Sequence, residues 1–247
     1  MRALRGAWRL LRVLVHALGG LATIAFVFPR LGEAQRQRRV EAWARGMLHR
    51  LGIDLRVHGQ APQHGPVLLV ANHISWADIL VVHAARHCRF VSKSDVRHWP
   101  LVGRLATGAG TLYIERESRL DAMRVVHHMA AALQSGDILA VFPEGTTSGG
   151  IDLLPFHANL VQAAVAAGAP AQPVALQFID TRSGRMSLAP CYIGDDTLLA
   201  SLWRTVTGDP VTAVVSFGTP QHAGGRDRRA WAADLRAAVQ RLRESSA

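Results

Sequence analysis

The chain has 247 residues, of which 49% are hydrophobic and 19% charged, a composition that excludes a disordered protein and suffices for one large domain with a short additional segment. Its formal net charge is +10, and almost every cation is an arginine, because Lys93 is the one lysine. A surplus of this size predicts an anionic partner, namely nucleic acid, acidic lipid headgroups or an acidic protein.

Residues 1–50 carry most of this positive charge. They contain ten arginines against Glu33 and Glu41, a surplus of eight, whereas the remaining residues are close to neutral. The body of the chain is therefore no general polyanion binder, and it contains no recognised nucleic-acid-binding motif. We expect no nucleic acid among the partners.

The first predicted element is a membrane-associated helix. Residues 13–28 are almost wholly apolar, a run slightly shorter than the roughly 20 residues that a spanning helix needs. The arginines before it follow one another at spacings of three, four and three, which places them in one stripe of a helix. Such a helix can lie in a membrane interface with its guanidinium groups on lipid phosphates.

A second helix is predicted over residues 33–51, where Val40, Ala44, Met47 and Leu51 mark one apolar face. Pro29 separates the two helices, so we expect an amphipathic hairpin that enters one leaflet. Residues 1–54 would form this membrane-associating hairpin and residues 55–247 the remaining domain. A cleaved signal peptide and a helix covering a soluble core are the alternatives, but no clear cleavage site follows, so we favour an uncleaved anchor.

Beyond residue 55, short runs rich in β-branched residues alternate with stretches of helical periodicity. The predicted strands are residues 67–71, 89–92, 111–114, 138–142, 172–179 and 212–217. The predicted helices are residues 77–86, 119–134, 159–167, 195–204 and 226–244. This alternation is typical of an α/β domain in which helices flank a largely parallel sheet. Active residues of such sheets gather in loops beyond the carboxyl ends of the strands.

The first motif, Asn-His-Ile-Ser-Trp-Ala-Asp at residues 72–78, directly follows a predicted strand. On one continuous helix His73 and Asp78 lie about 140° apart and do not meet. With His73 in the strand-to-helix turn and Asp78 in the first helical turn, the side chains converge. The carboxylate then keeps one imidazole nitrogen protonated while the other accepts a proton. Alternatively, Ser75 and Asp78 form a helix capping box and His73 is an ordinary loop histidine.

Three further motifs contain polar residues at strand ends. Phe-Pro-Glu-Gly-Thr-Thr-Ser at residues 142–148 offers a carboxylate, hydroxyl groups and a glycine that admits a ligand close to the backbone, although a plain polar turn is the alternative. Residues 110–116 end in Arg116, whose planar fork suits a phosphate, although it can equally be a surface arginine. Gln-Pro-Val-Ala at residues 172–175 marks the start or edge of a strand.

The sequence lacks the residues that several common enzyme mechanisms require. No G-x-S-x-G elbow provides a serine nucleophile, and the glycines of residues 103–110 are not followed by the Gly-Lys-Ser/Thr of a phosphate-binding loop. No H-E-x-x-H motif or close His/Cys cluster suggests zinc, so we expect neither a metal nor another cofactor. Cys88 and Cys191 form no disulfide framework and have no motif for a thioester intermediate.

Taken in order, the four motifs resemble the sequence blocks of the glycerophospholipid acyltransferase family, in particular its bacterial lysophosphatidic acid acyltransferases. Asn72-His73-x4-Asp78 is similar to the first block, residues 110–116 to the second, residues 142–148 to the third and residues 172–175 to the fourth. The resemblance extends over about residues 55–180, including Ser-Lys-Ser-Asp at 92–95 and Pro-x-x-Gly at 100–103. The N-terminal hairpin is similar to that of bacterial members.

The resemblance implies a glycerolipid acyltransferase-like fold and a specific reaction. A fatty acyl group would move from acyl-carrier protein or coenzyme A to the free hydroxyl of 1-acyl-sn-glycerol-3-phosphate, giving phosphatidic acid without a covalent enzyme intermediate. His73 would be the general base and Asp78 its orienting partner. The implied substrate-binding residues are Arg116 for the acceptor phosphate, Glu144, Gly145 and Thr146 for the glycerol phosphate, and Pro173 for the acyl or acceptor pocket. The enzyme would bind anionic lipids at the cytoplasmic face of the inner membrane.

Two alternatives concern the acceptor and the class of protein. Thr147 stands where the family often has a basic residue, and Phe-Pro-Glu-Gly-Thr-Thr-Ser is similar to relatives that acylate lyso-ornithine lipids, so the acceptor headgroup stays open between these lysolipids. A non-catalytic membrane-binding protein is the other alternative, which the presence of all four motifs disfavours.

Overall fold

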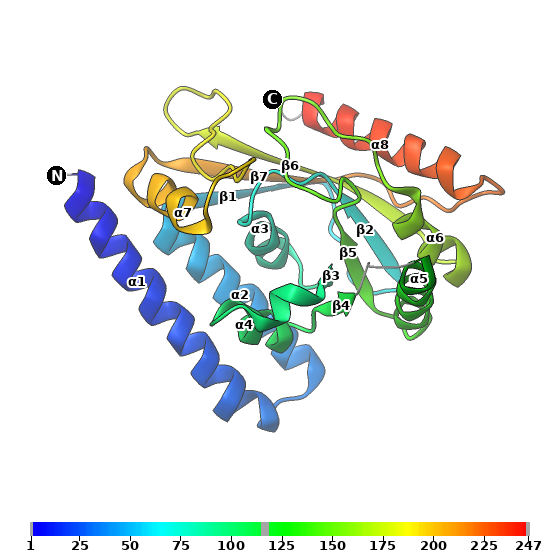
Figure 1. Cartoon of the computed structure of the whole chain (residues 1–247), viewed down its shortest axis with the longest axis horizontal. Coiled ribbons are helices and arrows are strands. Elements are labelled where there is room, and N and C mark those ends of the chain that lie inside the picture. The colour runs from blue at the N-terminus through cyan, green and yellow to red at the C-terminus, as the bar shows by residue number, and fades with distance from the viewer. Residues whose placement is uncertain (1, 115–118, 246–247) are drawn as a thin grey trace.

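The computed structural model describes residues 2–114 and 119–245, which contain a seven-stranded mixed sheet with strand order β1-β7-β6-β2-β5-β3-β4 (Figure 1). The strands are β1 (Ile53–His58), β2 (Val67–Ala71), β3 (Arg89–Lys93), β4 (Leu112–Ile114), β5 (Ile138–Val141), β6 (Ala171–Asp180) and β7 (Val211–Phe217). Neighbouring strands are parallel except β6 and β7, which are antiparallel. The predicted class, an α/β domain with a largely parallel sheet, is confirmed.

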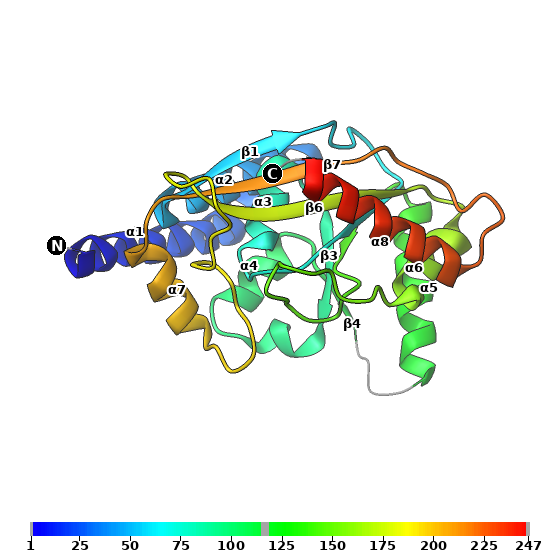
Figure 2. The same ribbon diagram turned by 90° about the horizontal axis from the view of Figure 1, so that it is seen from above.

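Helices cover both faces of the sheet (Figures 1 and 2). They are α1 (Arg2–Ala22), α2 (Glu33–Leu51), α3 (Asp78–Ala85), α4 (Val102–Gly108), α5 (Arg119–Gln134), α6 (Ala158–Ala167), α7 (Leu198–Thr207) and α8 (Arg228–Ser245). Short turns of π- and 3₁₀-helix, η1 (Thr23–Val27) and η2 (Phe28–Arg30), continue α1, and η3 (Ser94–His98) follows β3. Helices α2 and α3 pack on one face, and α5, α6 and α8 pack on the other.

The covering helices explain why the central strands are continuous apolar runs. Every residue of β2 is buried, because its neighbouring side chains point alternately into two different cores. Leu69 packs with Leu48 and Leu51 of α2 in one core. Leu68 packs with Met129 of α5 and the helices on the opposite face. A strand exposed on one face would instead alternate polar and apolar residues.

Two elements were not predicted, and one is displaced from its predicted place. Strand β1 pairs with β7 at the edge of the sheet, and α4 follows η3. Helix α7 begins at Leu198 rather than at residue 195, because the Thr197 hydroxyl accepts a hydrogen bond from the Ala200 amide and caps the helix there.

Helices α1 and α2 lie side by side (Figure 1). The Trp43 indole donates to the His16 carbonyl at 3.1 Å, and their rings stack at 5.4 Å. Ala44, Leu48 and Leu51 of α2 are buried in the main core, so α2 supports the sheet directly. Within the described residues, Arg2–Arg30 is the one helix long and apolar enough to cross a membrane, judged by length and composition. Entry of the two helices into one leaflet, and a domain boundary after residue 54, stay predictions.

Two arginines of the α1 stripe have partners within the protein. Arg5 donates to the carbonyls of Thr207 and Gly208 at 3.2 and 3.1 Å, and Arg9 donates to the carbonyl of Val206 at 3.1 Å. These carbonyls lie at the C-terminal end of α7, where the helix dipole attracts cations. The two guanidinium groups therefore hold α1 against α7. The predicted contact of the arginine stripe with lipid phosphates stays a prediction.

Candidate active site

The strand-to-helix turn after β2 brings His73 and Asp78 together. His73 Nδ1 lies 2.8 Å from Asp78 Oδ2, and the carboxylate is fully buried at 0% exposure. Because an ionised carboxylate only accepts hydrogen bonds, this contact assigns the ring proton to Nδ1. Nε2 makes no hydrogen bond to any described residue and is left to accept a proton. The His73 ring also stacks on Phe142 with a centroid distance of 4.0 Å, which fixes the ring plane.

Asp78 also organises the backbone of this turn. Its Oδ2 atom accepts hydrogen bonds from the amides of Ile74 and Ser75 at 2.7 and 2.8 Å. The carboxylate thus satisfies backbone amides, as the capping alternative required, and meets the imidazole with the same oxygen. Its other oxygen, Oδ1, is buried without a hydrogen-bond partner among the described residues. The two interpretations of Asp78 are therefore compatible.

The loop at residues 142–148 holds the backbone of His73 on both sides. Glu144 Oε1 accepts from the His73 amide at 2.8 Å, and the Ser148 amide donates to the His73 carbonyl at 2.8 Å. Glu144 Oε2 accepts from the Leu154 amide at 3.0 Å. Burial raises the pKa of the Glu144 carboxyl, and its amide donors partly oppose that shift. Both carboxylate oxygens of Glu144 are therefore engaged by the backbone, and the predicted contact with substrate stays untested.

The remaining residues of this loop differ in conformation, exposure and contacts. Gly145 has a φ of +73°, a left-handed conformation that glycine adopts without strain. Thr146 is exposed at the loop tip. The Thr147 hydroxyl donates to the Tyr192 carbonyl, so it links the loop to the segment before α7.

The segment of residues 189–193 is a part of this site that the sequence did not indicate. The Ser75 hydroxyl donates to the Pro190 carbonyl, and the Tyr192 amide donates to the Ile74 carbonyl at 3.3 Å. Ser201 of α7 accepts from the Trp76 indole at 3.0 Å. This segment has no motif of its own, because its contacts with residues 74 and 75 use its backbone carbonyls and amides.

Two predicted substrate-binding residues, Arg116 and Pro173, remain. Arg116 lies outside the described residues, although β4, the strand that precedes it, runs parallel to β3. Pro173 is paired with Val70 of β2 and lies against Gly218, where it lines a hollow of about 440 Å³ beside α8. The contacts of Pro173 with Gly218 and with this hollow thus lie toward α8, on the face opposite α3.

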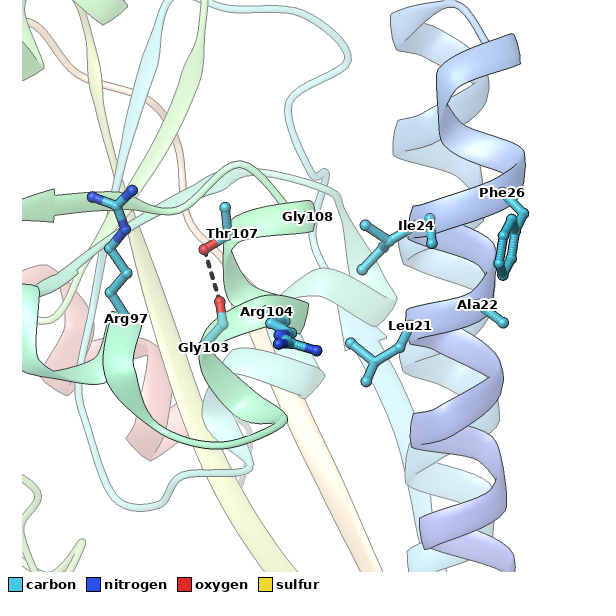
Figure 3. Close-up of a pocket in the computed structure, with 10 residues that line it drawn as sticks. Leu21, Ala22, Ile24, Phe26, Arg97, Gly103, Arg104, Thr107 and Gly108 are labelled. Atoms are coloured by element: carbon cyan, nitrogen blue, oxygen red, sulfur yellow. Dashed lines mark hydrogen bonds between the residues drawn. The ribbon is translucent and has the colours of Figure 1, made fainter.

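A larger hollow of about 610 Å³ lies between α4 and the end of the N-terminal helix (Figure 3). Its lining is mostly apolar and consists of Leu21, Ala22, Ile24, Ala25, Phe26, Arg97, Gly103, Arg104, Thr107 and Gly108. Leu21 and Ile24 point toward α4, whereas Phe26 points away from it. Gly108 allows this close approach, since a Cβ atom there would lie 2.4 Å from Ile24. Tyr113 of β4 donates to the Gly103 carbonyl at 3.1 Å and ties the hollow to the sheet.

The fold is that of a lipid acyltransferase. The chain matches the crystal structure of the 1-acyl-sn-glycerophosphate (LPA) acyltransferase PlsC from Thermotoga maritima with a TM-score of 0.69, over 98% of both chains. The two sequences are 21% identical, so this comparison shows the fold alone.

Sequence comparison places the chain more narrowly. Residues 54–177 match the Acyltransferase family model. The chain is 38% identical to a lyso-ornithine lipid O-acyltransferase of Pseudomonas aeruginosa over 97% of its own length and 93% of that protein. It is 39% identical to a 1-acyl-sn-glycerol-3-phosphate acyltransferase of Neisseria gonorrhoeae over 74% of its own length and 71% of that protein. The chain belongs to the acyltransferase family.

Proposed function

We propose that this protein is a lysolipid O-acyltransferase in which His73 is the general base. The observation that carries the proposal is the 2.8 Å contact between His73 Nδ1 and the buried Asp78 carboxylate, which leaves Nε2 as a proton acceptor. The names of the relatives in Pseudomonas and Neisseria support a lysolipid as the acceptor. The mostly apolar hollow beside α4, with Arg97 and Arg104 in its lining, also suits an amphiphile with an anionic head.

In the proposed reaction, His73 Nε2 removes the proton of the lysolipid hydroxyl as its oxygen attacks the thioester carbonyl. A new ester bond forms, the carbon–sulfur bond breaks, and the thiolate leaves with the proton returned by the imidazolium. The thioester is already activated, so the reaction requires no acyl-enzyme. In agreement with this, Cys88 and Cys191 are both buried, and burial raises the pKa of the Cys191 thiol to about 11.

The acceptor that we propose is 1-acyl-sn-glycerol-3-phosphate, and the donor is acyl-carrier protein or coenzyme A thioester. Arg116 would bind the phosphate, Glu144, Gly145 and Thr146 would line the acceptor site, and Pro173 would contribute to an acyl or acceptor pocket. The reaction would take place at the cytoplasmic face of the inner membrane, where both thioester donors are present. Residues 1–54 would attach the remaining domain to that membrane.

Lyso-ornithine lipid is a second candidate acceptor, and two observations favour it. The Pseudomonas relative with that name matches over almost the whole of both chains. Thr147, at a position where a basic residue would suit a phosphate, instead binds the Tyr192 carbonyl. The loop thus presents no cation of its own to an anionic headgroup.

One transfer assay tests both the role of His73 as general base and the identity of the acceptor. Purified protein in mixed micelles with one acyl donor is given either lysophosphatidic acid or lyso-ornithine lipid, and the acylated product is quantified. We expect His73→Ala to lower the transfer rate about 10²- to 10⁴-fold, the usual contribution of a general base.

The control for this assay is the fold of the variant. His73→Ala must keep the circular dichroism spectrum and thermal unfolding midpoint of the wild-type protein. Transfer at a near-wild-type rate by the folded variant would refute the role of His73 as general base. Transfer to neither lysolipid by the wild-type protein would refute the proposed function.

A further inference from the structure

Helix α7 presents two large apolar side chains to the outside. Leu199 is 76% exposed and Trp203 is 43% exposed, and they lie one turn apart on the same side of the helix. The other side of α7 carries the buried residues Ser201 and Thr205. Leu199 and the exposed part of Trp203 therefore form an apolar surface on the outer side of α7.

This surface adjoins the apolar face of α1. A Cβ atom at Gly6 of α1 would lie 3.5 Å from the Trp203 ring and 2.5 Å from Thr207, so the two helices are in close contact. The outward face of α1 is itself apolar, with Leu4, Trp8, Leu11, Val15 and Leu18 all exposed. At about 100° per residue, Ala3, Ala7 and Leu10 fill the flank of α1 between Gly6 and this face. No charged residue interrupts the path from Trp203 to the exposed face.

The charges of α1 lie on its other flank. Arg5 and Arg9 are bound to carbonyls at the C-terminal end of α7, which leaves the outward surface free of their guanidinium groups. Two tryptophans, Trp8 and Trp203, stand on this surface, and tryptophan is enriched where a protein meets the boundary between lipid tails and headgroups. An uncharged surface with tryptophans, flanked by arginines, fits a lipid bilayer better than water.

The inner side of α7 contacts the strand-to-helix turn that holds His73 and Asp78. Ser201, on the inner side of the same helix, accepts from the indole of Trp76, two residues before Asp78. The Tyr192 amide, in the segment before α7, donates to the Ile74 carbonyl of the same turn. Contact of α7 with a membrane would therefore place this turn one helix away from lipid.

We infer that Leu199 and Trp203 of α7 form, together with the outward face of α1, one lipid-contacting surface that seats the catalytic turn on the bilayer. The inference rests on the proposed function, since it assumes that the enzyme meets its acceptor at a membrane. It adds α7 to the membrane-contacting elements, which the sequence limited to residues 1–54.

An environment-sensitive dye on α7 tests the inference directly. Cys88 and Cys191 are buried, so the nitrobenzoxadiazole dye coupled to Leu199→Cys is selective, and the wild-type protein treated with the same reagent gives the background. The matched control is Met123→Cys on α5, where Met123 is 71% exposed and no inferred lipid contact exists. We expect vesicles of phosphatidylcholine and phosphatidylglycerol to shift the emission at residue 199 to the blue, with quenching by lipid-borne nitroxide, and to leave residue 123 unchanged.

A charge at the same position gives an independent readout. We expect Leu199→Glu to weaken flotation with these vesicles about tenfold or more, because a buried leucine contributes at least that factor, and Met123→Glu to leave flotation unchanged. A dye at residue 199 that stays in water while the protein floats with vesicles would overturn the inference. A blue shift that depends on protein concentration without vesicles would also overturn it, since it would assign the surface to a second copy of the chain.

These outcomes separate the inference from the proposed function. If the protein transfers acyl groups in micelles while residue 199 remains in water, the proposed function holds and the inference about α7 is wrong. If residue 199 enters lipid but no acyl group is transferred to either lysolipid, the inference about α7 holds and the proposed function is wrong.

Discussion

At the scale of single residues, Glu144 is better explained as a residue that positions His73 than as one that faces open solvent. Its two oxygens accept from the amides of His73 and Leu154, and the carboxylate is 4% exposed. Glu144→Gln replaces one acceptor oxygen by an NH₂ group, which then faces an N–H donor. We expect a free energy of unfolding lower by about 1–3 kcal/mol, the cost of a buried donor without a partner. We also expect a lower kcat at nearly unchanged KM.

The split between kcat and KM decides the role of Glu144. A residue that mainly binds the acceptor would raise KM on substitution and leave the thermal unfolding midpoint as it was. That pattern in purified Glu144→Gln would contradict the positioning role.

The contact between His73 and Asp78 could be predicted from the sequence, and the partners of Glu144 could not. The spacing of five positions from His73 to Asp78, after an apolar strand, restricts how the two side chains can meet. Glu144 is held from Leu154, ten residues further along an irregular segment, and from a backbone amide of another loop. Backbone donors have no residue identity, so no motif records them.

At the scale of elements, α7 supports the catalytic turn through one side chain. The Ser201 hydroxyl accepts from the Trp76 indole and lies 2.9 Å from the Cys191 carbonyl, to which it donates. Ser201→Ala removes both contacts, so we expect the unfolding free energy to fall by about 1–3 kcal/mol and kcat to fall with it. Activity and urea unfolding, measured on the same preparations, check this expectation.

Thr197→Ala is the matched control for Ser201→Ala. It removes the cap of the same helix, at a cost of about 1 kcal/mol, but does not touch the catalytic turn. An equal loss of kcat in both variants would mean that α7 affects activity through its stability alone.

Several elements could be predicted almost to the residue from a long apolar run or a helical period, and two short elements were missed. The bounds of β2, α2 and α5 agree with those expected from the sequence. Helix α4 escaped prediction because it is short and contains two glycines, which disfavour helix. Strand β1 alternates apolar and polar residues as an edge strand does, and this period of two was a signal that the sequence offered.

At the scale of the whole molecule, part of the positive charge of residues 1–50 is engaged in contacts within the protein. Arg5 and Arg9 bind the end of α7, while α2 is built into the main core. The apolar face of α1 is exposed. Removal of residues 1–50 would therefore unfold the core as well as detach a membrane anchor, and point substitutions on α1 are the better probe of attachment.

We expect apolar insertion of α1 to be the main source of membrane affinity. Raising the salt concentration from about 0.1 M to about 1 M shortens the Debye length from about 10 Å to about 3 Å, so a mainly electrostatic attachment would be lost. Flotation with neutral phosphatidylcholine vesicles should instead persist at the higher salt.

Leu11→Glu combined with Leu18→Glu should weaken this flotation about 100-fold, because each buried leucine contributes about 1.5–3 kcal/mol. Val57→Glu, at the exposed C-terminal end of β1, is the control and should bind as the wild-type protein does. Release of the wild-type protein by salt, with no effect of the two leucine substitutions, would show that the remaining arginines hold it to the membrane.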